Sequence, residues 1–221
     1  MAEILPGIHR VEGVDPSPDF STHVWLLRDT ASSWALVDTG LPDAHKAILA
    51  YLAKQKIAPE SIKKIVITHL HRDHVGSLAA MAKATRARTF AHWIEAAYIA
   101  EDPKYDGPGM PPAEPFHVDE RFKDGDSLDI AGGLIAYHTP GHTPGSTSYY
   151  LAHQKVLFSG DLFMGVPELA LTHPDYTHHM PTAQISAKRM AALDIDAILN
   201  HHGGPWPRGA GAQLKALVKK F

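Results

Sequence analysis

The segment Thr68-His69-Leu70-His71-Arg72-Asp73-His74 gathers three imidazoles and one carboxylate into six residues. It follows the apolar run at residues 65–67 and precedes Gly76 and a helical pattern of apolar residues. This order predicts a strand that delivers polar side chains into a loop, with a helix behind it. Neutral imidazole and carboxylate are both ligands for zinc and related ions, so the segment is a candidate metal-binding loop.

The composition is that of an ordinary globular protein. The chain has 221 residues, a net charge of −3 and 44% hydrophobic residues, and it has no basic run of the kind that follows a phosphate backbone, so we do not expect nucleic acid as a partner. It has no cysteine, so any metal must be held by nitrogen and oxygen ligands. We recognise no signal peptide and no membrane-spanning run. We therefore expect a cytoplasmic protein with a small-molecule substrate and no membrane partner, and we keep a homodimer as one option for its assembly.

Apolar runs and turn residues predict the order of strands and helices. The predicted strands cover residues 7–13, 23–27, 33–37, 62–68, 88–91, 127–130, 134–138, 148–151, 155–158 and 197–199. The predicted helices begin near residues 43, 78, 93, 182 and 214. Loops are expected at residues 15–19, 102–115 and 162–176. Two β-rich halves, each backed by helices, favour one domain over residues 1–221 in which two sheets pack face to face with helices outside.

Candidate ligands follow four of the predicted strands. After the first cluster come His142 in the loop at 139–146, Asp161 in a Ser-Gly-Asp turn, and His201 or His202 near the end of the chain. Seven nitrogen and oxygen ligands are too many for one tetrahedral ion with an open position. They suit two ions that share one bridging carboxylate and one bridging hydroxide.

These motifs, taken in order, resemble the metallo-β-lactamase superfamily. They are His-x-His-x-Asp-His at 69–74, Gly-His-Thr-Pro-Gly-Ser at 141–146, Ser-Gly-Asp at 159–161 and His-Gly at 202–203, with an early Asp-Thr-Gly turn at 38–40. The resemblance extends over nearly the whole chain. It implies an α/β fold of the αβ/βα type, a four-layer sandwich of two mixed β-sheets with helices on the outer faces, and a dimetal site at one edge.

The resemblance also implies a role for each ligand. The first metal would be held by His69, His71 and His142, the second by Asp73, His74 and His202, and Asp161 would bridge the two. His202 is preferred to His201 because the family's last ligand is directly followed by glycine, as His202 is by Gly203. Asp38 is expected to brace the metal loop through hydrogen bonds without binding metal itself. The expected cofactors are two divalent ions, zinc first, with iron or manganese as alternatives.

The expected activity is that of a dinuclear-metal-dependent hydrolase acting on a small ester, thioester or lactone. Two ions lower the pKa of a bridging water, and the resulting hydroxide is the nucleophile. Asp73 is the catalytic candidate, because its carboxylate can orient the hydroxide or pass a proton onward. No side-chain nucleophile is required, in agreement with the missing cysteine and the missing Gly-x-Ser-x-Gly motif.

This sequence differs from several branches of the family, and the differences narrow the range of expected substrates. Penicillin-destroying members usually carry Cys or Ser in place of Asp161. The glyoxalase II branch has this full ligand set but adds a C-terminal helical extension for glutathione, whereas this sequence ends at Phe221. Lactonases of similar size usually place Tyr after the bridging Asp, where this chain has Leu162. Flavodiiron oxygen reductases have Glu in place of His71, and RNA-processing members carry additional domains. The glyoxalase II-like and lactonase-like branches therefore remain.

Other classes stay open beside the hydrolase. One is a mononuclear-iron persulfide dioxygenase-like oxidoreductase, which uses two His and one Asp of the same set; the others are a phosphodiesterase and a non-catalytic metal-binding member. The Pro- and Gly-rich loop at 102–115 suggests a lid beside the pocket. Candidate substrate contacts from the two long loops are Tyr105, Met110, Phe163 and Met164.

Overall fold

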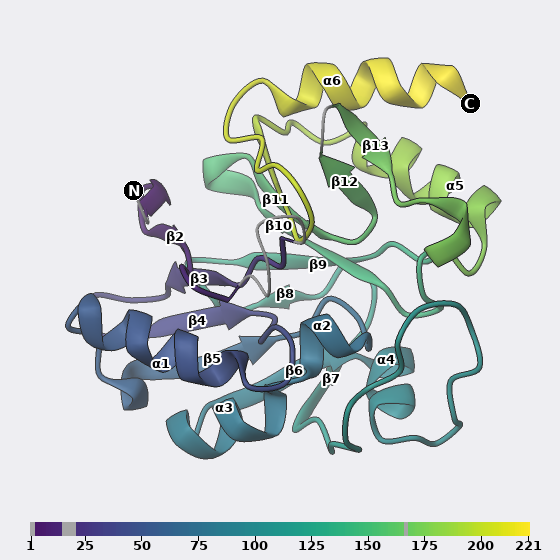
Figure 1. Cartoon of the computed structure of the whole chain (residues 1–221). Coiled ribbons are helices and arrows are strands. Elements are labelled where there is room, and N and C mark those ends of the chain that lie inside the picture. The colour runs from purple at the N-terminus through teal and green to yellow at the C-terminus, as the bar shows by residue number, and fades with distance from the viewer. Residues whose placement is uncertain (1–2, 15–20, 166–167) are drawn as a thin grey trace.

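Two large β-sheets pack face to face in the computed structural model, with helices outside both (Figure 1). The structure describes residues 3–14, 21–165 and 168–221. The loop expected at residues 15–19 lies outside the described residues. The layers run helix, sheet, sheet, helix, which confirms the predicted αβ/βα sandwich.

The first sheet is mixed and has seven strands in sequence order. Its strands are β1 (Glu3–Leu5), β2 (Ile8–Arg10), β3 (Trp25–Arg28), β4 (Trp34–Val37), β5 (Ile62–Val66), β6 (Arg88–His92) and β7 (Glu120–Phe122). Strands β1 to β4 pair antiparallel, and β4 to β7 pair parallel. The parallel crossovers are made by α1 (Ala44–Lys54) with the short helix η1 (Pro59–Ser61), by α3 (Leu78–Thr85) and by α4 (Trp93–Ile99).

The second sheet has five strands in the order β14-β11-β10-β9-β8. These are β8 (Ser127–Leu128), β9 (Leu134–His138), β10 (Thr147–Leu151), β11 (Val156–Gly160) and β14 (Ala197–Asn200), with η2 (Ala152–Gln154) between β10 and β11. Only β11 and β14 pair parallel. Helices α5 (Met180–Met190) and α6 (Ala210–Leu217), followed by η4 (Val218–Lys220), cover its outer face (Figure 1).

Successive side chains of each strand point to alternate faces of its sheet, and this alternation produces three separate hydrophobic cores. In β3, Leu26 packs outward under the helices of the first sheet, whereas Trp25 and Leu27 pack inward against the second sheet. In β11, Phe158 faces that same inner core and Leu157 faces α5 and α6. Successive side chains of a strand point to opposite faces, so a strand that is buried on both faces reads as a continuous apolar run.

Three regions differ from the predicted order. The loop expected at 162–176 contains the hairpin strands β12 (Phe163–Gly165) and β13 (Leu169–Leu171) and the short helix η3 (Pro174–Tyr176). Residues Arg72–Val75 form the short helix α2, so Asp73 and His74 are helical and do not lie in a loop. Strands β1 and β7 were not expected. Each of the new strands has three residues, which is too short for an alternating pattern to be recognised.

The sheets are joined at the edge where the candidate ligands lie. The backbone N–H of Thr147 donates to the carbonyl oxygen of Thr68 over 2.9 Å, and the Tyr149 hydroxyl donates to the carbonyl of Ile67 over 2.6 Å. These bonds fix the end of β5 against β10. In the described part of the chain, no helix combines the length and apolar character needed to cross a bilayer.

Candidate metal centre

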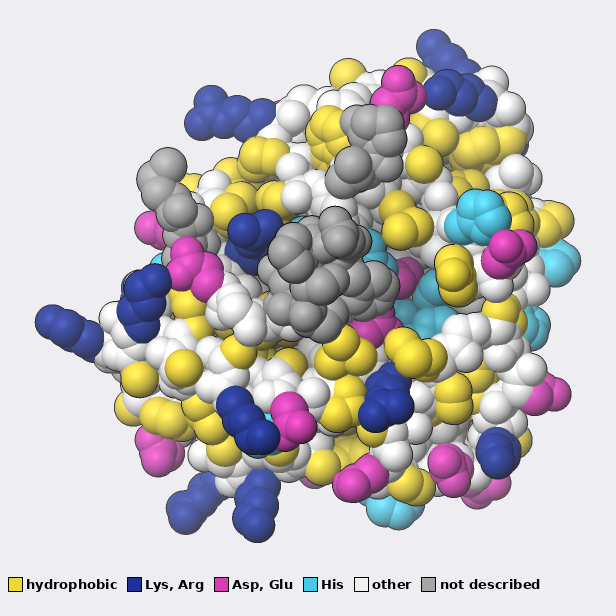
Figure 2. Space-filling model, in the orientation of Figure 1, with side chains coloured by type: hydrophobic (Ala, Val, Ile, Leu, Met, Phe, Trp, Pro, Cys, Tyr) yellow, Lys and Arg dark blue, Asp and Glu magenta, His cyan; other side chains and the backbone are white. Residues whose placement is uncertain are grey.

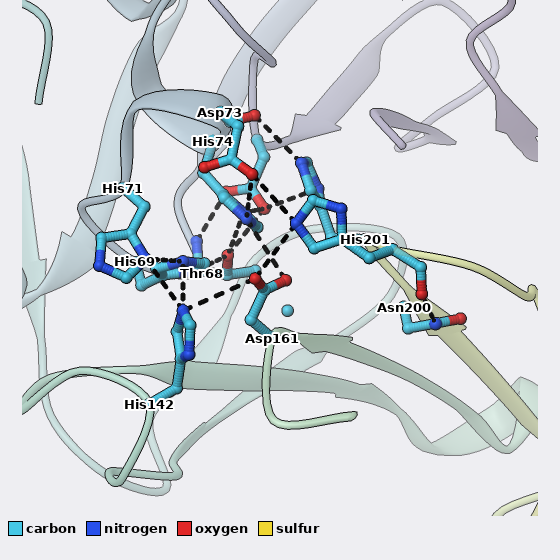
Figure 3. A network of polar contacts seen from close by, with 12 residues as sticks. Thr68, His69, His71, Asp73, His74, His142, Asp161, Asn200 and His201 are labelled. Atoms are coloured by element: carbon cyan, nitrogen blue, oxygen red, sulfur yellow. Dashed lines mark hydrogen bonds and ion pairs between the residues drawn. The ribbon is translucent and has the colours of Figure 1, made fainter. Parts of the chain in front are cut away.

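The ligand candidates from distant parts of the sequence converge at one edge of the sandwich (Figure 3). His69 and His71 follow β5, His142 lies in the loop after β9, and Asp161 follows β11. Asp73 and His74 come from α2, and His201 and His202 follow β14. Figure 2 shows histidine and acidic side chains gathered in a recess on one face of the molecule. All of the predicted metal ligands are therefore brought together.

Three ring nitrogens form a triangle. Nε2 of His69 lies 3.1 Å from Nδ1 of His71, and Nε2 of His142 lies 3.1 Å and 2.9 Å from these same two atoms. All three rings are buried. A tetrahedral zinc site with bonds of about 2.0–2.1 Å needs ligand nitrogens roughly 3.3 Å apart, so the triangle is close to the size of one face of such a site. We call these residues the three-histidine group.

A second group of donors lies beside the first. Asp73, His74, His201 and His202 each offer one donor atom, and these atoms lie within 4.8 Å of one another. Asp161 lies between the groups. Its Oδ2 is 3.3 Å from Nε2 of His202 and 3.6 Å from Nε2 of His142, and its Oδ1 is 3.3 Å from Nε2 of His74. One carboxylate thus reaches rings of both groups.

Asp38 and Thr68 set the tautomers of two of the rings. The Thr68 hydroxyl and backbone N–H donate to the Asp38 carboxylate over 2.7 and 2.8 Å. Because that hydroxyl proton is used, Thr68 can only accept from Nδ1 of His69, 3.1 Å away. Nδ1 of His74 lies 2.9 Å from Oδ2 of Asp38 and donates to it. Both rings then keep the Nε2 lone pair for the centre, as expected of metal-binding histidines.

The two neighbouring histidines at the end of β14 have different partners. Nδ1 of His202 donates to the carbonyl of Ser21 over 2.6 Å, so the other ring nitrogen, Nε2, faces the centre. Without a metal ion, the protonated Nε2 donates to Oδ2 of Asp73, 3.0 Å away. Nε2 of His201 instead lies 3.0 Å from the backbone carbonyl of Asp73, and its ring stacks on His74 with centroids 3.5 Å apart. The geometry favours His202 as the donor to the centre and His201 as a packing partner.

Burial and nearby charges shift the pKa values of the rings in opposite directions, so the rings differ in protonation. Burial lowers the pKa of His71 to about 4 and that of His142 to about 3, and it also lowers the pKa of His69 well below its usual value. Burial also disfavours the charged form of His74, but nearby carboxylates, chiefly Asp161, outweigh it and raise the pKa of His74 to about 10. The three-histidine group is therefore neutral at pH 7, which is the form that binds a metal ion.

The same carboxylates act on His202. Burial lowers the pKa of His202, but Asp161 and Asp73 raise it well above its usual value. In return, His74 and His202 lower the pKa of Asp73 against the effect of burial, and the two rings do the same for Asp161. Both carboxylates are ionised at neutral pH, and they attract either protons on these rings or a cation between them.

Several atoms at the centre have no satisfactory partner in the protein alone. Nε2–H of His71 donates to the carbonyl of Pro108 over 3.0 Å, so the lone pairs of His71 Nδ1 and His69 Nε2 face each other at 3.1 Å. Nε2 of His74 and Oδ1 of Asp161 are buried and make no hydrogen bond of regular geometry among the described residues, although they lie 3.3 Å from each other. Buried polar atoms are normally satisfied. A cation that accepts these lone pairs would satisfy them, so the residues present fit a metal centre.

The loop at 102–115 lies against the three-histidine group through His71. Besides the bond to Pro108, the N–H of Arg72 donates to the carbonyl of Met110 over 3.2 Å. A Cβ on Gly109 would lie 2.5 Å from the His71 ring, so only glycine allows the backbone to approach so closely. The loop is irregular, as expected, and it covers one side of a candidate ligand.

The candidate substrate contacts differ in accessibility. Met110 is 45% exposed, and Met164 is partly buried. Tyr105 is buried, with its hydroxyl donated to the carbonyl of Pro108, and it packs edge-on against His71. Phe163 is fully buried in the core beneath α5 and α6, so the expectation that it contacts substrate is corrected: its ring contributes to packing.

Two residues beside the centre, Thr68 and Glu95, were not predicted to belong to the site. The apolar pattern predicts Thr68 only as the end of a strand, although its place directly before His69 is a usable signal. Glu95 lies one helical turn before the apolar residue Ile99, and a carboxylate on the buried face of a helix is the available signal. Its carboxylate accepts hydrogen bonds from the Thr143 hydroxyl and from Gly145 N–H.

Comparison with known proteins assigns the family. The family model described as the metallo-beta-lactamase superfamily matches residues 17–202, which is most of the chain. The chain belongs to the metallo-β-lactamase superfamily. The matched region contains every candidate ligand from His69 to His202. The recognition made from the motifs is thereby confirmed, and the chain is a metallo-hydrolase homologue with a His/Asp cluster able to bind metal ions.

Similar proteins include hydrolases and solved members of this superfamily. A hydroxyacylglutathione hydrolase of Pseudomonas entomophila is 34% identical over 186 residues, covering 81% of this chain and 61% of that protein. A probable metallo-hydrolase of Bacillus subtilis is 26% identical, covering 78% and 76%. A metallo-β-lactamase family protein of Thermus thermophilus superposes with a TM-score of 0.76 at 25% identity, covering 99% and 79%. The chain spans about three-fifths of the length of the hydroxyacylglutathione hydrolases that it matches.

Proposed function

We propose that the chain is a dinuclear-metal hydrolase of a small ester, thioester or lactone. The observation that carries the proposal is the position of Asp161, whose Oδ2 lies 3.6 Å from His142 in the three-histidine group and 3.3 Å from His202 in the second group. A carboxylate shared by two donor groups is the arrangement expected between two ions. In this proposal His69, His71 and His142 hold one ion, Asp73, His74 and His202 hold the other, and zinc is the first candidate metal.

The protein's own residues would orient the reaction. Two bound divalent cations supply an acidified water and a polarised substrate carbonyl. Asp73 is ionised at neutral pH, because His74 and His202 outweigh burial and lower its pKa, so it can accept a hydrogen bond from the attacking water. A proton held at an oxygen of Asp73 is then available for the leaving group. Asp38 and Thr68 keep the rings in the tautomer that leaves their lone pairs on the centre.

The substrate class is proposed on two grounds. Relatives at 33–34% identity are hydroxyacylglutathione hydrolases, which supports a thioester or a chemically similar acyl bond. The exposed side chain of Met110 stands on the loop that binds His71 and Arg72, where it offers an apolar contact to an acyl or thiol group. Because the match covers only 61% of those relatives, their glutathione moiety is not carried over.

The test is a hydrolysis screen with thioesters, lactones, aryl esters and phosphodiesters, with the metal content measured on the same sample. We expect turnover of at least one of the first three classes and two divalent ions per chain. His71→Ala should abolish that turnover, whereas His153→Ala, at an exposed histidine of η2, should leave it unchanged. A sample with one iron per chain that forms sulfite from a persulfide and hydrolyses none of these substrates would contradict the proposal.

A further inference from the structure

A buried carboxylate lies behind the metal centre and has no role in the function proposed above. Glu95 in α4 is fully buried. A buried glutamate is normally paired with a cation, but the hydrogen-bond partners of Glu95 are neutral. Its Oε1 accepts hydrogen bonds from the Thr143 hydroxyl and from the Gly145 N–H, the latter over 3.2 Å. Such a group needs an explanation beyond packing.

The contacts of Glu95 lead to both segments that carry the three-histidine group. Thr143 directly follows His142. The backbone N–H of Leu70, between His69 and His71, also interacts with the carboxylate and favours its charged form. Among the described residues, Oε2 accepts no hydrogen bond of regular geometry, and Leu70 lowers the pKa of Glu95 less than Thr143 and Gly145 do. Glu95 is thus hydrogen-bonded to the segment of His142 and interacts more weakly with the segment of His69 and His71.

The loop after β9 is shaped to receive this carboxylate. A Cβ on Gly145 would lie 2.7 Å from the backbone nitrogen of Glu95 and 2.8 Å from its Cγ, so a larger residue would push the loop away from α4. The Thr143 hydroxyl also lies 2.7 Å from the hydroxyl of Ser146, whose oxygen accepts the N–H of Thr143 over 3.0 Å. The hydroxyl that meets Glu95 is thus held in a defined direction.

We propose that Glu95 is a positioning residue, which holds the loop of His69 and His71 and the loop of His142 at the spacing that the three-histidine group needs to bind its metal ion. The inference rests on the proposed metal centre and adds to it a residue that touches neither ion nor substrate. The inference predicts a selective effect. Loss of the carboxylate lowers the affinity of the three-histidine group for its metal ion, and it leaves the affinity of the group formed by Asp73, His74 and His202 unchanged.

Stability alone does not explain the carboxylate. Burial raises the pKa of Glu95 to about 7, although the hydrogen bonds from Thr143, Gly145 and Leu70 lower it. Ionising this group in the folded protein therefore costs free energy near and above neutral pH. Glutamine has the same shape and avoids this cost. A purely structural role would make Glu95→Gln harmless or stabilising in every measurement, including metal binding.

The experiment titrates the metal-free wild type and Glu95→Gln with Zn²⁺ in the presence of a chromophoric chelator. Long-range ¹H–¹⁵N spectra of the imidazoles identify which rings bind. We expect two ions in the wild type. In Glu95→Gln we expect about 10–100-fold weaker binding of one ion, with the rings of His69, His71 and His142 responding only at the higher zinc concentration. The melting temperature of the metal-free variant should equal or exceed that of the wild type. Wild-type affinity for both ions in Glu95→Gln would overturn the inference.

Two further variants separate positioning from general loosening of α4. Thr143→Val removes the hydroxyl that donates to the Glu95 carboxylate, so it should lower the affinity for the same ion. The double variant Thr143→Val/Glu95→Gln should show no further loss of that affinity. Ile99→Ala removes buried volume from the same helix and should lower the melting temperature while keeping both affinities. If Ile99→Ala lowered the affinity for the same ion as much as Glu95→Gln does, the positioning role of Glu95 would be overturned. A wild-type protein that binds no zinc, iron or manganese would overturn the proposed function and, with it, this inference.

Discussion

Oδ2 of Asp161 lies 3.3 Å from Nε2 of His202, although the two residues come from the ends of different strands, β11 and β14. The same oxygen lies 3.6 Å from Nε2 of His142. Strands β11 and β14 are parallel neighbours, so their carboxyl ends meet at one edge of the sheet. The first sheet brings the segment from His69 to His74 to that edge. The fold thus places a single carboxylate between two groups of ring nitrogens.

The pair formed by Asp38 and Thr68 should control metal affinity. Thr68→Val removes the hydroxyl that binds Asp38 and accepts from His69. We expect metal affinity to fall roughly 10-fold or more, because His69 loses the hydroxyl that fixes its tautomer and Asp38 loses a hydrogen bond that orients it toward His74. The matched control is Thr89→Val, since Thr89 binds Asp119 through its N–H and hydroxyl in the same way, over 2.9 and 2.7 Å, away from the centre. Equal metal affinity in the two variants, measured by zinc titration, would refute the role of Thr68.

The approach of the loop at 102–115 to His71 can be tested with glycines. Gly109 and Gly125 both have positive φ, +91° and +82°, so alanine costs roughly 1–2 kcal/mol of backbone strain at either site. A Cβ on Gly109 would clash with the His71 ring, whereas one on Gly125 meets nothing within 4 Å. Gly109→Ala should lower turnover several-fold, and Gly125→Ala should lower only stability. Urea unfolding and steady-state kinetics measure the two effects, and unchanged kinetics in Gly109→Ala would show that the contact is dispensable.

The two neighbouring histidines should respond differently to substitution. His202→Ala removes the ring that faces Asp73 and Asp161 and should reduce the bound metal from two ions toward one. His201→Gln should retain both ions, because Nε2 of His201 binds the backbone carbonyl of Asp73 and an amide can donate to the same acceptor. Metal analysis after dialysis distinguishes them. If His201→Gln loses an ion while His202→Ala keeps both, the assignment is reversed.

Metal uptake should release protons. Despite burial, carboxylates raise the pKa of His74 to about 10 and that of His202 well above its usual value, so both rings carry an extra proton in the metal-free protein at pH 7. Binding must displace these protons, so affinity rises with pH until it passes the pKa of each ring. We expect release of about two protons from these rings at pH 7. Calorimetry in buffers of different ionisation enthalpy measures the number, and zero net release would contradict the assigned ligands.

Much of the centre could be predicted because its chemistry is local in sequence. His69, His71, Asp73 and His74 occur within six residues, and each remaining ligand follows a recognisable apolar strand. Long apolar runs, such as the one in β3, also identify strands that are covered on both faces. The order of strands and helices was therefore sufficient to predict the sandwich, with the ligands at its edge.

What could not be predicted depends on contacts between distant segments. Glu95 lies on a helix that shows an ordinary apolar pattern, and only the fold shows that its carboxylate meets the loop at 143–145. The hairpin of β12 and β13 is built from three-residue strands, which carry no readable period. The place of Phe163 just after Asp161 predicts an aromatic ring near the substrate, but the hairpin turns that ring into the core.

The number of metal ions bound by the wild type and by Asp161→Asn tests the central claim most directly. Each protein is loaded with Zn²⁺, dialysed and analysed for metal per chain, with hydrolysis measured on the same sample and folding checked by circular dichroism. We predict two ions in the wild type, and at most one in a folded Asp161→Asn variant whose turnover is lower by at least about 100-fold, since the bridging position is lost. Two tightly bound ions and full activity in Asp161→Asn would contradict a centre joined by Asp161.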